Sequence, residues 1–291
     1  MSTSNENSTG SRQVTLYADA IALTIAGSDP SGGAGLQADL KTFQQLGVYG
    51  MSVVTLITVQ NTQAVRQVEV LSPDLIIAQF DAVLEDIPPR AIKVGALGNA
   101  AVVRAVAQRL RSLQCPIVVD PVFVSKHGHS LVTDDVVIAY KEHLLPQATL
   151  VTPNRFEAER LTGLTLDDEE AVAKAIYLLE QLGLKHVLVK LGEVHGESQH
   201  VLNLKDGNIG IRMPRLTTRN THGTGCILAA AITANLALGE TDINSAVHFG
   251  IQRTFETIQF DTDLGKGVHP AEIRAMSSFS AQPSETDHFP I

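Results

Sequence analysis

Residues 220–226 read Asn220-Thr221-His222-Gly223-Thr224-Gly225-Cys226, and a run without charged residues follows from Ile227 to Leu238. The glycines let backbone N–H groups turn toward one point, where the dipole of a following helix adds partial positive charge. A turn of this kind in front of a helix is an anion-binding site. Because the run is almost entirely Ala, Ile and Leu, we expect a helix buried on all sides, whose N-terminus opens into a central cleft.

Cys226 enters this predicted helix close to His222. A thiol at a helix N-terminus next to a histidine has its thiolate favoured, so Cys226 is a candidate base or nucleophile. The same residues also fit a plain helix-entry turn in which Cys226 fills a small space in the core. The heptapeptide alone leaves both interpretations open.

The composition limits the classes of protein to which the chain can belong. Its 291 residues, 44% of them hydrophobic, suffice for one large α/β domain with its own core. The net charge of −9 and the lack of a basic stripe interleaved with aromatic residues argue against nucleic-acid binding. Cys115 and Cys226 lie far apart and lack metal-ligand spacing, which argues against a disulfide scaffold or zinc site and favours a reducing cytoplasm. No run approaches the length of a membrane span, and residues 1–11 lack a signal-peptide core.

Short runs of Val, Ile and Leu alternate with amphipathic segments from Ala20 onward. We expect strands at Ile21–Ala26, Met51–Val59, Ala91–Val94, Ile117–Val119, Thr149–Val151 and His186–Leu191. We expect helices at Leu36–Leu46, Pro73–Asp86, Ala100–Leu113, Thr133–Leu145, Arg155–Leu161, Asp168–Leu182 and Asn244–Ile258. This alternation predicts an α/β fold with a doubly wound, mainly parallel central sheet and helices on both faces.

Two features complete the predicted organisation. Val201–Leu204 and Ile209–Met213 flank Asp206-Gly207 and predict a small hairpin at one edge of the sheet. Residues 1–17 are polar and predict a disordered leader, residues 277–291 predict a flexible tail, and residues 18–276 predict a single domain.

Polar residues gather behind the carboxyl ends of the expected strands, where open parallel sheets bind their ligands. Residues 27–35 form the glycine-rich segment Gly27-Ser28-Asp29-Pro30-Ser31-Gly32-Gly33-Ala34-Gly35 after the first strand. This segment lacks the Lys-Ser/Thr pair of a Walker A loop, and no acidic residue closes the next strand as a dinucleotide-binding site would need. It is either a backbone-lined cradle for a small substrate or a long flexible turn. The later strand ends contribute Gln60, Gly95, Asp120, Asn154, Glu157 and Lys190.

Two carboxylates among these residues suit a magnesium ion. Asp120 and Glu157 are hard oxygen ligands of the kind that hold Mg²⁺ through water beside a polyphosphate. Asn154 and Glu157 also fit a simple helix N-terminus, as N-cap and as a residue favoured by the helix dipole. Lys190 ends a buried strand and needs an anionic partner. Lys126 lies in a loop that could close over a phosphate, or it is an ordinary surface lysine.

Together these groups suit phosphoryl transfer without a Walker loop. Backbone N–H groups and Lys190 would hold phosphate charge, magnesium would bridge oxygens, and Cys226 would take the proton of the acceptor hydroxyl. Of the groups at the anion turn, Cys226 is the one suited to act as that base.

Five segments of the chain carry a family resemblance. They are residues 22–35, residues 38–43 (Ala38-Asp39-Leu40-Lys41-Thr42-Phe43), Val119-Asp120-Pro121-Val122, Val151-Thr152-Pro153-Asn154 and residues 220–226. Together they resemble the hydroxymethylpyrimidine/phosphomethylpyrimidine kinases of thiamin biosynthesis, within the ribokinase-like superfamily. The similarity runs from about Ala20 to about Pro270, and its first and last segments are the most specific.

The resemblance implies a role for each candidate residue. It makes Cys226 the catalytic base and the backbone of Gly223, Thr224 and Gly225 the anion hole. It implies an acceptor pocket lined by Gly27, Asp39, Gln60 and Gly95, with Gln60 reading the aminopyrimidine edge and Lys126 reaching the substrate phosphate in a second reaction. It implies ATP as co-substrate, held by Asn154, Lys190, Thr221 and His222, with Mg²⁺ at Asp120 and Glu157, and it implies a homodimer in the cytoplasm.

Three departures from the family pattern keep alternatives open. Ala96 replaces a methionine beside Gly95 and enlarges the pocket, which favours a pyridoxal or pyridoxine kinase of the same fold as the alternative. Leu191 and Glu193 replace a glycine and a histidine after Lys190, which motivates a catalytically weakened pyrimidine-binding protein as a third hypothesis. Residues 265–270, Gly265-Lys266-Gly267-Val268-His269-Pro270, replace a common Gly-His-Gly-Pro.

Overall fold

The computed structural model describes residues 20–123, 132–194, 196–276 and 287–288. The predicted leader and Lys126 lie outside the described residues. Within the predicted tail, residues 277–291, the structure describes only the short strand β10 (Asp287–His288), which pairs antiparallel with β9. None of the described helices combines the length and the apolar composition needed to cross a bilayer.

Six strands form the central sheet in the order β3-β2-β1-β4-β5-β6. They are β1 (Ile21–Ser28), β2 (Tyr49–Gln60), β3 (Val65–Val70), β4 (Ala91–Val94), β5 (Ile117–Val119) and β6 (Leu150–Val151). All pairs are parallel except β2 with β3. The sequence prediction missed β3, because its mostly exposed side chains give it no buried apolar run.

An antiparallel meander extends this sheet beyond β6. It consists of β7 (Leu188–Val194), β8 (Glu197–Leu204) and β9 (Gly207–Pro214). Parallel bridges join Val151 to Val187 and Asn154 to Lys190, so β7 continues the parallel sheet. The predicted edge hairpin is confirmed, since Leu204 pairs with Gly207 across the turn.

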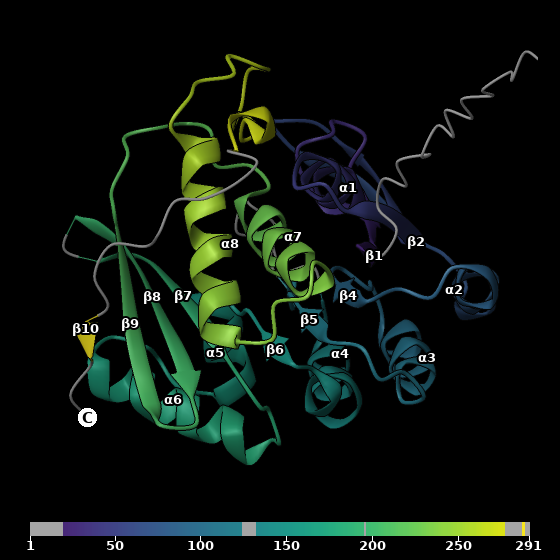
Figure 1. Cartoon of the computed structure of the whole chain (residues 1–291), viewed down its shortest axis with the longest axis horizontal. Helices are drawn as coiled ribbons and strands as arrows, with labels where there is room; N and C mark the ends of the chain where they lie inside the picture. The colour runs from purple at the N-terminus through teal and green to yellow at the C-terminus, as the bar shows by residue number, and fades with distance from the viewer. Residues whose placement is uncertain (1–19, 124–131, 195, 277–286, 289–291) are drawn as a thin grey trace, which may run out of the picture.

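Helices cover both faces of the sheet (Figure 1). One face carries α1 (Gly35–Gln45), α7 (Thr224–Ala237) and α8 (Ile243–Ile258). The other carries α2 (Pro73–Asp86), α3 (Ala100–Leu110), α4 (Asp134–Ala139), α5 (Arg155–Thr162) and α6 (Glu169–Gln181). The predicted helix Thr133–Leu145 is shorter than expected, because α4 passes into a π-helical turn at Tyr140–Leu144.

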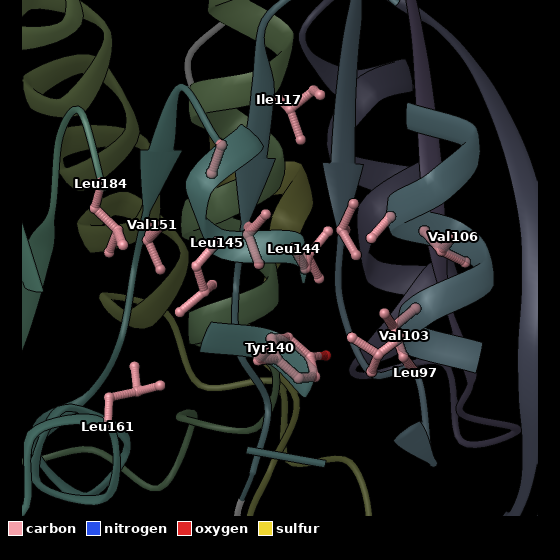
Figure 2. Close-up of a cluster of buried hydrophobic side chains, with 14 of the residues drawn as sticks. Leu97, Val103, Val106, Ile117, Tyr140, Leu144, Leu145, Val151, Leu161 and Leu184 are labelled. Atoms are coloured by element: carbon pink, nitrogen blue, oxygen red, sulfur yellow. The ribbon is translucent and has the colours of Figure 1, made fainter. Parts of the chain in front are cut away.

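Alternation along the strands builds one hydrophobic core on each face. Ile92 and Val94 face the larger core beneath α2–α6, whereas Ala91 faces α1, α7 and α8. Figure 2 shows part of the larger core, where Tyr140 packs near Leu97 and Val103. The expectation for α7 is confirmed, since every residue from Ile227 to Ala234 is buried. A helix enclosed in this way can only present its N-terminus to a ligand.

Strand order places the cleft. From β1 the chain moves to β2 on one side and later to β4 on the other, so the helices that follow β1 and β4 lie on opposite faces of the sheet. Crevices at such a switch point, outside the carboxyl ends of the strands, are where open α/β sheets bind ligands.

Candidate active site

One cavity of about 1140 Å³ lies over the carboxyl ends of the strands and brings together nearly all the predicted site residues. Its lining includes Gly27, Gln60, Gly95, Asp120, Asn154, Glu157, Lys190, Thr221, His222, Gly223, Thr224, Gly225 and Cys226. Cys226 therefore shares one cavity with the ends of the first two strands. Asp39 does not line the cavity, and Lys126 lies outside the described residues.

The turn before α7 has the geometry of an anion hole. Gly223 adopts φ +84°, and a Cβ there would lie 1.8 Å from the carbonyl oxygen of Gly33. Only glycine lets the glycine-rich segment pack this closely on the turn. The first N–H groups of a helix have no acceptor within the helix, so those of Gly225 and Cys226 remain for a ligand. Of the predicted anion-hole residues, Thr224 differs from expectation, because its N–H donates to Thr221 O at 3.5 Å.

Lys190 and Asp120 form an ion pair beside this turn. Lys190 Nζ lies 2.8 Å from Asp120 Oδ1, which also accepts a hydrogen bond from Thr152 Oγ1 at 3.1 Å. Burial alone would raise the pKa of Asp120, but the positive charges of Lys190 and Lys93 outweigh it and lower that pKa. A Cβ on Gly225 would lie 3.5 Å from Lys190 Nζ and 3.7 Å from Asp120 Oδ2. The absent side chain of Gly225 therefore leaves a space bounded by a helix N-terminus and an ammonium group.

Asn154 and Glu157 form a capping box at the start of α5. Asn154 Oδ1 accepts from the Glu157 N–H at 3.0 Å, and Glu157 Oε2 accepts from the Asn154 N–H at 2.8 Å. Glu157 Oε1 also accepts from the Phe123 N–H at 3.3 Å. Burial raises the pKa of Glu157 to about 7, although the charge of Lys190 opposes this. Asn154 and Glu157 therefore cap the helix, as one interpretation of the sequence expected, and they also line the cavity, as the other expected.

This donor set fits a magnesium ion held through water. Asp120 Oδ2 faces the space beside Gly225, whereas both oxygens of Glu157 already accept backbone hydrogen bonds. Within the described residues, no three His, Cys, Asp or Glu side chains converge on one point as direct ligands. An ion bound mainly by substrate phosphates and water, with one or two carboxylates behind it, is the arrangement that magnesium prefers.

The environment of Cys226 differs from the sequence expectation. Burial raises the pKa of its thiol to about 11, and the largest opposing influence is the charge of Lys93. The Gly35 N–H, which donates to the sulfur, also lowers this pKa. The neighbouring histidine does not supply this stabilisation: His222 Nε2 lies 2.8 Å from Asp29 Oδ2. Lys93, whose positive charge opposes the effect of burial on this pKa, is not among the site residues predicted from the sequence.

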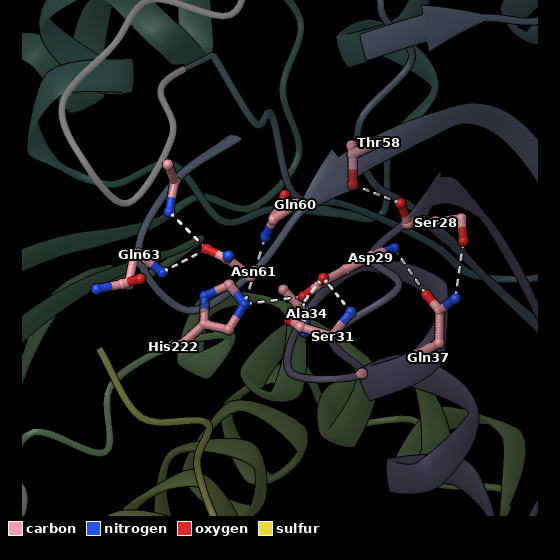
Figure 3. Close-up of polar contacts among 12 residues, drawn as sticks. Ser28, Asp29, Ser31, Ala34, Gln37, Thr58, Gln60, Asn61, Gln63 and His222 are labelled. Carbon is pink, nitrogen blue, oxygen red and sulfur yellow. Dashed lines mark hydrogen bonds and ion pairs between the residues drawn. The ribbon is translucent and has the colours of Figure 1, made fainter. Parts of the chain in front are cut away.

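Figure 3 shows how His222 ties the acceptor end of the cavity together. Its Nε2 lies between Asp29 Oδ2 and Gln60 Nε2, which is 3.4 Å away. Asp29 also accepts hydrogen bonds from the N–H groups of Ser31 and Ala34, both at 2.9 Å. The predicted nucleotide residue His222 thus contacts the glycine-rich segment and the end of β2. Because His222 Nε2 donates its hydrogen to Asp29, it cannot also accept one from Gln60, and the side-chain amide of Gln60 remains for a ligand.

Residues 265–270, whose effect the sequence did not reveal, clamp the loop after Gln60. The Val268 N–H donates to Thr62 O at 3.0 Å, and the Gly267 N–H donates to Thr62 Oγ1 at 3.2 Å. The His222 N–H donates in turn to His269 O at 3.0 Å. This segment therefore fixes both the loop after β2 and the turn before α7.

The structure corrects the expected role of Asp39. Its side chain is fully buried behind the cavity wall, where Oδ2 lies 2.8 Å from Lys93 Nζ and accepts from Thr24 Oγ1 at 2.6 Å. Asp39 is placed to act on the pocket through Lys93, which does line the cavity. A lysine inside the otherwise apolar strand Ala91–Val94 was a signal that could have identified this pair.

Two further side chains of the meander lie differently from expectation. Glu193 forms an ion pair with Arg215 at 2.7 Å, so it does not present an unpaired acid to bound phosphate. His200 belongs to β8 and lines the cavity, although it is not among the site residues predicted from the sequence. Burial lowers the pKa of His200 to about 4, so its ring is neutral at pH 7.

Comparisons with known proteins agree with this geometry. A family model described as phosphomethylpyrimidine kinase matches residues 29–272. The hydroxymethylpyrimidine/phosphomethylpyrimidine kinase of Rhizobium meliloti is 48% identical over 223 residues, covering 76% of this chain and 84% of that protein.

Two solved structures are similar across most of the fold. The phosphomethylpyrimidine kinase of Clostridium difficile superposes with a TM-score of 0.72 at 40% identity, covering 81% of this chain and 98% of that one. The pyridoxal kinase of Staphylococcus aureus, solved with ADP, superposes with a TM-score of 0.81 at 34% identity, covering 88% and 93%. The chain belongs to the family of hydroxymethylpyrimidine/phosphomethylpyrimidine kinases, and it is a kinase with a ribokinase-like fold.

Proposed function

We propose that this chain transfers the γ-phosphoryl group of ATP to the hydroxymethyl group of 4-amino-5-hydroxymethyl-2-methylpyrimidine, and then to the resulting monophosphate to give the diphosphate, in thiamin biosynthesis. The observation that carries the proposal is the shared cavity of Cys226, Gln60 and the Lys190–Asp120 pair. A base, a polar group for a heterocycle and a phosphate-binding wall thus line one space. Membership of the kinase family supports the same activity.

In the first reaction, the thiolate form of Cys226 takes the proton of the acceptor hydroxyl as the hydroxyl oxygen attacks the γ-phosphorus of ATP, and ADP leaves. The N–H groups of Gly225 and Cys226 stabilise the charge on the transferred group, and Lys190 supports them from the opposite wall. Asp120 and Glu157 would hold Mg²⁺ through water, and the ion would neutralise phosphate charge. Thr221 and Asn154 complete the nucleotide side, and Gln60 with its amide donor and acceptor orients the pyrimidine.

The direct test is product formation from ATP, Mg²⁺ and hydroxymethylpyrimidine, followed by chromatography of the mono- and diphosphates. We expect both products from the wild type, and a turnover lower by about 10²–10⁴-fold in Cys226→Ala, with ATP binding retained. Cys115→Ser is the matched control, because Cys115 does not line the cavity. No product from the folded wild type, or full turnover in Cys226→Ala, would contradict the proposal.

A second acceptor is favoured by one specific observation. Ala96 lines the cavity beside Gly95 and leaves room at the acceptor end, and the similar Staphylococcus aureus enzyme is a pyridoxal kinase. Turnover of pyridoxal and of hydroxymethylpyrimidine should therefore be compared at equal ATP. A kcat/KM higher for pyridoxal would make this alternative the main activity.

We also propose that the chain works as a homodimer in the reducing cytoplasm. Ile57 and Val59 of β2 are 50% and 51% exposed and face away from the cavity, whereas Thr58 and Gln60, which alternate with them, line it. These two exposed apolar side chains on an edge ribbon suit contact with a second copy. Cys115 and Cys226 carry free thiols, which supports a reducing compartment.

A further inference from the structure

A fully buried ion pair, Lys93 with Asp39, lies at the wall of the cavity that Cys226 lines. Lys93 projects from β4 on the same face as Ala91, which packs in the core built by α1, α7 and α8. Its Nζ is 2.8 Å from Asp39 Oδ2 on α1, and both side chains have no solvent exposure. Thr24 Oγ1 of β1 donates to the same carboxylate oxygen at 2.6 Å. Three neighbouring elements thus hold one ammonium group in a fixed position.

Stability alone does not account for this pair. A buried ion pair loses the solvation of both charges, and well-packed apolar side chains of similar size are often as stable or more so. Asp39 Oδ1 has no hydrogen-bond partner among the described residues, so the carboxylate is not even fully satisfied. The desolvation of the pair therefore costs folding free energy, and we look for a role of the pair at the site.

The position of Lys93 in the cavity indicates such a role. Lys93 lines the same cavity as Cys226, and a Cβ on Gly95 would lie 3.4 Å from its Nζ. The ammonium group therefore lies beside Gly95, at the acceptor end of the cavity that Cys226 also lines. Helix α7, which begins next to Cys226, packs directly on β4.

Other charges also act on the sulfur. Asp39 and Asp120 disfavour the thiolate, Lys93 and Lys190 favour it, and the Gly35 N–H donates to it. Lys93 has the largest influence among the charged groups. The negative charge of Asp39 is directed at Lys93 and offsets only part of that influence.

We propose, on the basis of the proposed role of Cys226 as base, that Lys93 is a positioning residue whose ammonium group stabilises the Cys226 thiolate. Asp39 and Thr24 hold the ammonium group of Lys93 at the acceptor end of the cavity. When the thiolate takes the proton of the acceptor hydroxyl, the sulfur loses its negative charge, so Lys93 acts on the reaction through Cys226.

The test measures the thiol directly, without turnover. The rate of alkylation of Cys226 by iodoacetamide is followed by mass spectrometry of its peptide, from neutral pH to about pH 11, the pKa of the buried thiol. Two variants move the charge in opposite senses. Lys93→Met/Asp39→Asn removes both charges without leaving either buried alone, whereas Asp39→Asn removes only the carboxylate.

We expect alkylation of Cys226 below its pKa to be about three- to tenfold slower in Lys93→Met/Asp39→Asn and faster by a similar factor in Asp39→Asn, since tenfold corresponds to one unit of pKa. Thr42→Val, a buried uncharged change one turn from Asp39, should leave the profile unchanged. Faster alkylation in both variants would mean simple loosening of the core and would overturn the proposal, as would two unchanged profiles.

Two provisions keep the result decisive. If the double variant does not fold, Asp39→Asn alone decides, because faster alkylation with an unchanged rate at Cys115 supports the proposal and an unchanged rate at Cys226 overturns it. A kinase assay on the same samples separates this inference from the proposed function. A wild type without kinase turnover would contradict the proposed function. Normal turnover together with unchanged profiles of alkylation rate against pH would contradict only the role of Lys93.

Discussion

At the scale of single residues, Asp29 shows how one side chain fixes the acceptor end of the cavity. Burial alone would raise its pKa, but hydrogen bonds from His222 and Ser31 outweigh burial and hold it at about 2. The carboxylate thus stays charged at all physiological pH values. It joins the glycine-rich segment to the turn before α7, two segments nearly two hundred residues apart in the chain.

This lowered pKa predicts a pH-dependent contribution to stability. The folded value of about 2 lies below the ordinary 3.8, so the contribution is present above about pH 4 and is lost as pH falls toward 2. We expect Asp29→Asn to lower the free energy of unfolding at pH 7 by about 1 kcal/mol, allowing for solvent screening. Urea unfolding as a function of pH measures it, with Asp86→Asn at the exposed end of α2 as control. A constant difference between wild type and variant down to pH 2 would refute this account.

A substitution at Gly225 should change catalysis without lowering stability. A Cβ there meets only ordinary contacts with Lys190 and Asp120, so Gly225→Ala should fold with an unchanged or slightly higher melting temperature. The added methyl group occupies the space proposed for the transferred phosphoryl group, so we expect kcat/KM for ATP to fall by about 10²-fold. Kinetics and thermal melting of the same preparation check both halves. Normal kinetics in this variant would place the phosphoryl group elsewhere.

At the scale of elements, Gly267 of the segment 265–270 packs against Thr62, in the loop that follows Gln60. A Cβ on Gly267 would lie 1.9 Å from Thr62 O, so Gly267→Ala must displace the loop that follows Gln60. We expect the KM for the pyrimidine to rise about tenfold, while the KM for ATP stays near its wild-type value. Lys266→Ala, the exposed neighbour, is the control. Equal increases in both KM values would indicate general disruption instead.

At the scale of the whole molecule, the β2–β3 ribbon extends past the end of β1, and β2 carries Thr58 and Gln60 on the cavity face and the exposed Ile57 and Val59 on the other. We expect Ile57→Lys/Val59→Lys to elute as a monomer in size-exclusion chromatography with light scattering, where the wild type elutes as a dimer. Because both side chains are half exposed, the variant should keep its fold by circular dichroism. A wild type that is monomeric at all concentrations would contradict the proposed homodimer.

The sequence predicted elements best where local signals were complete. Helix α2 begins and ends as expected, because Ser72 caps it and Pro73 occupies its first turn. Strand β3 was missed, since pairing with β2 on one edge needs no buried apolar run. The helix expected to continue to Leu145 changes to a π-helical turn at Tyr140, whose hydroxyl donates to Gly95 O at 3.2 Å across the core. Periodicity in the sequence does not register such a long-range contact.

The sequence by itself determined the α/β fold, the buried helix α7 and the anion turn before it, because apolar periodicity, glycine and capping residues act over a few neighbouring positions. Only the tertiary structure decided that His222 pairs with Asp29, that Asp39 lies behind the cavity wall, and that Lys93 shares the cavity with Cys226. These assignments depend on which distant side chains share a low-dielectric interior, where burial and a single opposing charge set the protonation state. The spacing of residues along the chain does not show which distant side chains will be buried together.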